Sequence, residues 1–149
     1  MTHDLGTTRR LIQAGRTSAT DEIERCIAVA QSDACAHAFT RTDFATARQR
    51  ASQPGAQHLP LAGLAVSIKD LFDVRGQPTA AGSVVLADAP AAAHDCAAVA
   101  RLRAAGASIL GRTHMVEFAF SGVGTNPHFS TPAAWDARFG TLPGPARVP

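Results

Sequence analysis

Apolar and polar residues alternate most clearly in the middle of the chain, over residues 64–69. Leu64, Val66 and Ile68 occupy one set of positions, and the set between them is small or polar and ends in Lys69. Successive side chains of a β-strand point to opposite faces of a sheet, so this period of two predicts a strand with one apolar face. A stretch rich in turn-forming residues follows and predicts a loop.

Two helical patterns precede this strand. Over residues 18–31, a hydroxyl residue that can cap free backbone N–H groups is followed by acidic residues and by apolar residues at helical spacing. A second helical stretch, 43–51, stops before a Pro-Gly turn. We therefore expect an N-terminal helical segment, 1–58, which packs on a core segment, 59–149.

A third helical pattern runs from Asp95 to Gly106, and a short apolar stretch, 107–111, predicts a second strand after it. The strand at 64–69, this helix and the second strand together form a βαβ unit, whose strands are parallel and whose crossover is right-handed. The predicted fold class is therefore α/β, with N-terminal helices followed by a βαβ unit. A single crossover helix cannot cover both faces of a parallel sheet. Little after Ser121 has the pattern of regular structure, so we expect the sheet to be unfinished.

Composition and charge narrow the function. The chain has 149 residues, of which 46% are hydrophobic and 17% charged, as in a globular domain. Its net charge is +2 and its arginines are scattered, so no basic face for nucleic acid is expected. It contains neither of the glycine-rich motifs that bind nucleotide phosphates, and we expect no cofactor.

The three cysteines, Cys26, Cys35 and Cys96, form an odd set without CxxC spacing. This argues against a disulfide framework and against a zinc site, so we expect small buried or free thiols and no metal. The first residues lack the layout of a signal peptide, and no stretch approaches the length needed to span a membrane. We therefore expect a cytoplasmic location and no membrane partner.

Lys69 is the only lysine of the chain, and the other thirteen basic residues are arginines. One interpretation is a strand-end lysine whose stem lies on apolar surface while its amine reaches solvent. Against it, α/β sheets bind ligands at the carboxyl ends of their strands, which is where Lys69 lies. A lysine partly withdrawn from water there can give up its proton and act as a base, which an arginine cannot do because it stays charged.

Three stretches carry a family resemblance: LAGLAVSIKDLFDVRGQPTAAGS at 61–83, HDCAAVARLRAAGASILGRTHMVEFAF at 94–120, and TNPHFSTPAAWD at 125–136. In this order they resemble the N-terminal third of the amidase signature family, over roughly residues 5–140. The resemblance implies an α/β/α fold with a mixed sheet. It also implies a hydrolase or amidotransferase that acts on small-molecule carboxamides.

By the same resemblance, the catalytic residues form a Ser–Ser–Lys triad in which Lys69 is the base. It acts through a bridging serine, held by a cis peptide bond, on the serine that attacks the carbonyl. The chemistry is consistent, because a serine hydroxyl is a poor nucleophile until a neighbouring base removes its proton.

The chain departs from the family where it ends. The bridging serine, the nucleophile and the backbone amides that stabilise the oxyanion all follow the region that matches 142–149. We therefore expect a truncated piece of an amidase, inactive alone, that forms a homodimer or associates with the missing C-terminal portion. Two alternatives stay open: a subunit of a glutamine-dependent amidotransferase, and an inert fragment that is not an enzyme.

Other residues near the motifs have structural interpretations. Ser67 and Ser83 do not match the serine positions of the triad, so we expect hydrogen-bonded structural serines. Asp70 either partners Lys69 or caps a turn. Glu117 matches the family's EFA stretch, where we expect a structural, hydrogen-bonded role. Asn126 begins an Asn-Pro-His run that also resembles the family, but the residues at 130, 133 and 134 differ from those the resemblance leads us to expect there.

Overall fold

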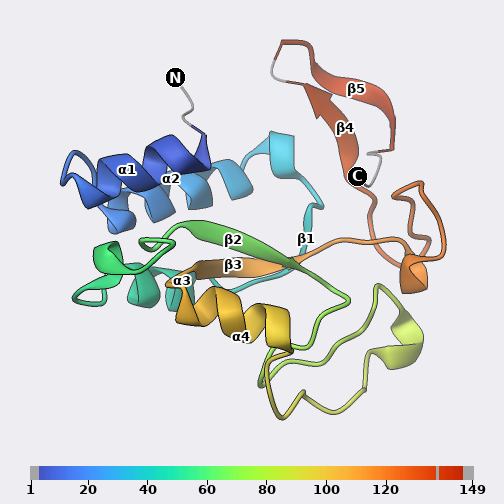
Figure 1. Cartoon of the computed structure of the whole chain (residues 1–149). Coiled ribbons are helices and arrows are strands. Elements are labelled where there is room, and N and C mark those ends of the chain that lie inside the picture. Colours follow the sequence, from blue (N-terminus) through green and yellow to red (C-terminus); the bar gives the residue numbers. More distant parts are fainter. Residues whose placement is uncertain (1–3, 137, 146–149) are drawn as a thin grey trace.

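A computed structural model describes residues 4–136 and 138–145. At its centre is a three-stranded sheet in the order β1-β3-β2 (Figure 1). Its strands are β1 (Phe39–Thr42), β2 (Ala65–Lys69) and β3 (Ser108–Thr113). β2 and β3 are parallel, whereas β1 runs antiparallel to β3. The sheet is therefore mixed, and the α/β fold class expected from the sequence is confirmed.

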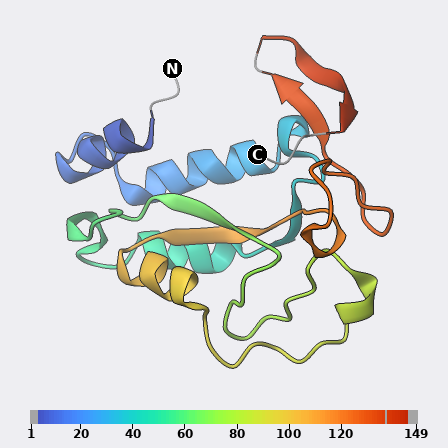
Figure 2. The ribbon, with the colours of Figure 1, turned by 45° about the vertical axis from the view of Figure 1, so that its right-hand side comes forward.

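Three helices precede or flank the first strands: α1 (Leu5–Gln13), α2 (Ala19–Ala30) and α3 (Phe44–Ala51). Figures 1 and 2 show α1 and α2 along one side of the sheet, and buried residues of α2 and α3 share one core cluster with it. The helices at 18–31 and 43–51 are confirmed as α2 and α3. As expected from the sequence, the α2 cap is Ser18, whose side chain accepts a hydrogen bond from the backbone N–H of Asp21 at 3.0 Å.

The main core lies between these helices and the sheet. It joins Ile23 and Ile27 of α2 and Ala47 of α3 to Leu64 and Leu110, all of which are buried. Burial of these apolar side chains is the main favourable contribution to folding, so the N-terminal helices and the sheet form one packed body.

The βαβ unit is confirmed as β2, α4 (Ala97–Ala104) and β3. A second core cluster forms where α4 lies against the sheet: buried Val99 packs near Ile68 of β2 and Val74 of the following loop. A long loop connects β2 to α4 and lies beyond the carboxyl end of β2 (Figure 2). This packing fixes the end of β2 on which Lys69 lies.

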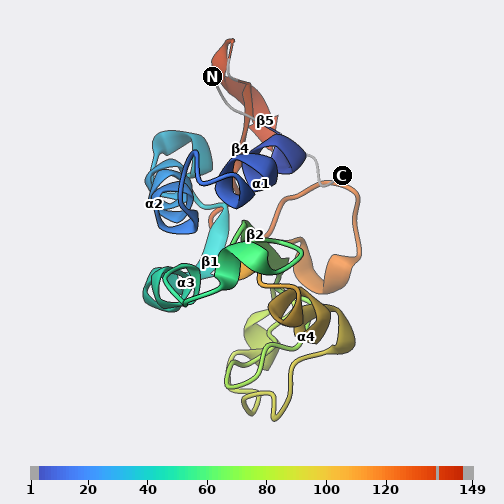
Figure 3. The same ribbon diagram turned by 60° about the vertical axis from the view of Figure 1, so that its left-hand side comes forward.

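The expectation of little regular structure after Ser121 is wrong. The strands β4 (Ala133–Asp136) and β5 (Gly140–Pro145) pair in an antiparallel hairpin, which projects away from the sheet (Figures 1 and 3). The glycines and prolines of this stretch concealed it, because a two-stranded hairpin has no partner at its outer edges and tolerates prolines there.

The short elements complete the description. The helix α1 and the strand β1 were not predicted from the sequence. The 3-10 turns are η1 (Asp33–Cys35), η2 (Ala56–His58), η3 (Val84–Leu86) and η4 (Glu117–Ala119). None of the helices in the described part of the chain is both long and apolar enough to span a membrane.

Candidate active site

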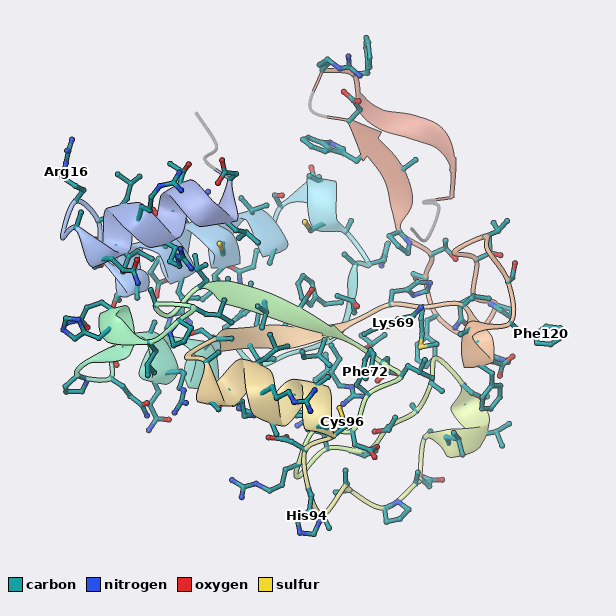
Figure 4. All side chains as sticks on the ribbon, in the orientation of Figure 1. Arg16, Lys69, Phe72, His94, Cys96 and Phe120 are labelled. Carbon is teal, nitrogen blue, oxygen red and sulfur yellow. The ribbon has the colours of Figure 1, made fainter. Side chains whose placement is uncertain are left out.

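Lys69 is the last residue of β2 and is half-buried. It lies opposite Thr113 of the parallel neighbour β3, at the carboxyl end of both strands, where the chain leaves the sheet (Figure 4). Its carbonyl oxygen accepts a hydrogen bond from the backbone N–H of Phe72 at 3.2 Å, so Lys69 also opens a four-residue turn. This is the position that the strand pattern predicted for it.

Among residues 4–136 and 138–145, no ion pair engages the amine of Lys69. The ion pairs between described residues all use other side chains. Four cavities of about 350 to 540 Å³ lie among the described residues, and Lys69 does not line any of these four. The residues described therefore support the lysine from its backbone side and leave its amine available to another group.

Asp70, the next residue, pairs with Arg112 of β3 and not with Lys69. The Nε of Arg112 lies 2.6 Å from Oδ1 of Asp70, and the two side chains are only 3% and 7% exposed. The other carboxylate oxygen accepts a hydrogen bond from the backbone N–H of Gly82 at 3.1 Å. Of the two interpretations of Asp70, the structure shows the cap of a loop, with an ion pair that the sequence did not predict.

A second set of hydrogen bonds holds the loop that faces this strand end. Ser83 is fully buried and donates its hydroxyl hydrogen to Oε1 of Glu117 at 2.6 Å. The imidazole Nε2 of His128 lies 3.3 Å from the same oxygen. The hydrogen bonding expected for Ser83 and Glu117 is therefore confirmed, whereas Ser67 is exposed on β2.

Sequence reasoning missed the role of Asn126. Its buried side-chain amide donates to the carbonyl of Gly82 at 2.6 Å and to the carbonyl of Met115 at 3.0 Å. It thereby joins the loop after β2 to the segment after β3. An asparagine followed by proline is a turn signal, but nothing in the sequence reveals which distant carbonyls it reaches.

The backbone is strained at the same place. Ala81 has φ 52° and Phe118 has φ 50°, both in the left-handed region that disfavours a Cβ atom, and the N–H of Phe118 donates to the carbonyl of Ala81 at 2.9 Å. Gly82 has φ 67°, and a Cβ atom added there would lie 2.8 Å from the carbonyl oxygen of Met115. Such strain persists only where surrounding contacts hold it, and it gathers at functional sites.

The three cysteines carry free thiols. Cys26, Cys35 and Cys96 are free and half-buried, as the sequence led us to expect. Burial raises the pKa of the Cys26 thiol, which disfavours the reactive thiolate. Among the described residues, no three side chains of the metal-ligating types are grouped to hold a metal ion.

Comparison with known proteins gives this arrangement a context. The Amidase family model matches residues 20–143, which include β2, the loop after it, α4 and β3. Lys69, Asp70 and Arg112 all lie within the matched stretch.

Two relatives illustrate the match. The chain is 38% identical over 125 residues to AtzE, the 1-carboxybiuret hydrolase subunit of Pseudomonas sp. (strain ADP), covering 79% of this chain and 27% of that protein. It is 36% identical over 140 residues to the glutamyl-tRNA(Gln) amidotransferase A subunit of Salinispora tropica, covering 85% of this chain and 27% of that protein. The chain thus spans less than a third of the length of these relatives.

A solved structure agrees in fold. A chain from a structure described as a vestigial protein complex, which bears on the origins of an s-triazine catabolic enzyme, superposes with a TM-score of 0.82 and is 35% identical. The match covers 88% of this chain and 30% of that one.

Proposed function

Because this chain belongs to the amidase signature family, we propose that it is the N-terminal part of a hydrolase that cleaves the C–N bond of a small carboxamide, and that Lys69 is the base. The observation that carries the proposal is the position of Lys69. It is half-buried at the carboxyl end of β2, with an amine that no described side chain occupies. A base needs such an uncommitted nitrogen, because its lone pair must be free to receive the proton of a hydroxyl.

In the proposed reaction, a serine hydroxyl adds to the amide carbonyl. Its proton passes through a bridging serine to the neutral amine of Lys69. When the tetrahedral intermediate collapses, the C–N bond breaks and the leaving amine takes a proton back along the same route. Water then hydrolyses the acyl-serine ester by the same steps, which releases the carboxylic acid and restores the free serine.

The longer members of the family extend beyond the stretch that matches this chain. Both serines and the oxyanion donors would come from that further part. We therefore propose that residues 1–149 alone do not hydrolyse amides, since a base without a nucleophile or an oxyanion site has nothing to activate.

The test uses an enzyme assembled from this chain and the remaining two-thirds of an amidase signature relative, with amide hydrolysis as the readout. We expect the assembled enzyme to turn over, the isolated chain to show no activity, and Lys69→Ala to lose roughly 100-fold or more in kcat. Arg101→Ala, on the exposed face of α4, is the matched control for loss of a basic side chain and should leave kcat unchanged. Turnover by Lys69→Ala close to that of the unchanged chain would reject the proposal.

A second candidate function is that of one component of an amidotransferase. The 36% identity to the Salinispora tropica protein, over 85% of this chain, favours it. Such a component would release ammonia from glutamine or asparagine and pass it to a carbonyl on a partner. Glutamine hydrolysis that rises when further subunits co-purify would support this function over that of a free-standing amidase.

A further inference from the structure

Arg112 holds the turn that begins at Lys69 from two sides. Its Nε donates to the carboxylate of Asp70 at 2.6 Å, and its Nη2 donates to the carbonyl oxygen of Phe72 at 2.9 Å. These are the second and fourth residues of the turn, whose closing hydrogen bond joins Phe72 to Lys69. A planar guanidinium presents donors in a fixed fork, so the two bonds fix the shape of the turn as well as its place.

Asp70 uses each of its polar atoms to fix the residue that follows Lys69. Its backbone N–H donates to the carbonyl of Thr113 at 3.2 Å, and its own carbonyl accepts from the N–H of Ala81 at 2.9 Å. Its carboxylate accepts from the N–H of Gly82 and from Arg112. Asp70 is therefore bound to β3 on one side and to the strained loop at 81–82 on the other.

The ion pair between Asp70 and Arg112 also determines which group the carboxylate next to Lys69 binds. Buried ion pairs contribute little net stability, because removing two charges from water offsets most of their attraction. Stability alone therefore gives little reason for two charges at 3% and 7% exposure in this place. With Arg112 bound, the carboxylate of Asp70 is engaged and does not form an ion pair with the amine beside it.

We propose that Asp70 and Arg112 are positioning residues for Lys69: they fix the strand end that carries the amine, and they keep the adjacent carboxylate away from it. This inference rests on the proposed role of Lys69 as the base. It differs from that role because it concerns how the lysine is held, which can be measured without activity.

The single lysine makes the measurement direct. In the 149-residue chain grown with lysine labelled with ¹³C at the ε-carbon, one ε-CH₂ signal reports on Lys69 alone. We expect two inequivalent ε-protons in the unchanged chain, as for a half-buried side chain on a fixed strand end, and we expect them to merge in Asp70→Asn. The matched control is Glu24→Gln, which removes the exposed two-bond pair with Arg48 and should leave the signal unchanged.

A second variant covers the case in which Asp70→Asn does not fold. The double change Asp70→Asn with Arg112→Gln removes both charges and leaves no unpaired buried charge, so it should still melt cooperatively. We expect it to merge the ε-proton signals as well. An unchanged signal in a folded variant overturns the inference, and so does a single merged signal in the unchanged chain.

The assembled enzyme separates this inference from the proposed function. Asp70→Asn should lower kcat on the order of 100-fold with KM unchanged, because a displaced base slows the chemical step and not substrate binding. If Lys69→Ala keeps its activity while the ε-proton signals respond to Asp70→Asn, the proposed function fails and the positioning of the lysine stands. If neither the ε-proton signals nor kcat change in Asp70→Asn, the proposed positioning of Lys69 is rejected and its role as the base stands.

Discussion

Ser83 and Glu117 are joined by a hydrogen bond of 2.6 Å that ties the loop after β2 to the segment after β3. Ser83 is fully buried, and its replacement by alanine leaves the carboxylate of Glu117 with one hydrogen-bond donor fewer. We expect Ser83→Ala to lower the free energy of unfolding by about 1–3 kcal/mol, measured by urea denaturation. Ser67→Ala, on the exposed face of β2, is the control and should change it by less than about 0.5 kcal/mol. Equal effects would contradict the buried bond.

A comparison of substitutions at Gly82 and Gly55 distinguishes the cost of backbone strain from the cost of steric contact. Gly82 and Gly55 both have positive φ angles, 67° and 84°, but only at Gly82 does an added Cβ atom meet a neighbour, the Met115 carbonyl oxygen at 2.8 Å. Gly55→Ala should cost about 1 kcal/mol for its conformation alone. Gly82→Ala should cost more, because the carbonyl must also move. Melting temperatures of the two variants test this, and a smaller loss at Gly82 would show that the loop is not held as described.

The core between α2 and the sheet gives a larger effect. Ile23 is fully buried, whereas Val29 of the same helix is half exposed. We expect Ile23→Ala to destabilise the chain by about 2–5 kcal/mol, since it leaves a cavity as well as losing buried area. Val29→Ala, a control in the same helix, should cost much less. Similar losses in denaturation midpoint for the two variants would be inconsistent with α2 packing through Ile23.

The exposed pair of Glu24 and Arg48 links α2 to α3 and should make a small contribution that depends on pH. Hydrogen bonds from Arg48 hold the pKa of Glu24 below its ordinary value. A carboxyl whose pKa is lower in the folded state stabilises the fold above its unfolded pKa and loses that effect as pH falls through the folded pKa. Glu24→Gln should therefore lower the urea midpoint at neutral pH but not at about pH 3. A difference that grows on acidification would reverse the sign and contradict the pairing.

Much of the fold was predictable because its signals are local. The alternation up to Lys69 gave β2, and caps with helical spacing gave α2, α3 and α4. The strand β1 was not predicted, because four residues, Phe39 to Thr42, are too few to show a clear alternation and their strand hydrogen bonds are made with β3.

The candidate site was predictable only in part. Lys69 stood out by its residue type and its place at a strand end. The pairing of Asp70 with Arg112 did not, because 42 residues separate them and each charge resembles an ordinary surface charge in the sequence. Buried polar contacts of this kind are set by the topology, which brings the ends of β2 and β3 together, and no local pattern records them.

Replacement of Lys69 by arginine in the assembled enzyme tests the central claim most directly. Arginine has a similarly long stem but stays protonated at neutral pH and cannot accept the proton of a hydroxyl, so it removes the base. We expect Lys69→Arg to melt like the unchanged enzyme and to lose about as much kcat as Lys69→Ala. An arginine variant that hydrolyses the amide substrate at the rate of the unchanged enzyme would show that a side chain that stays charged is sufficient at this position, and would contradict the role of Lys69 as the base.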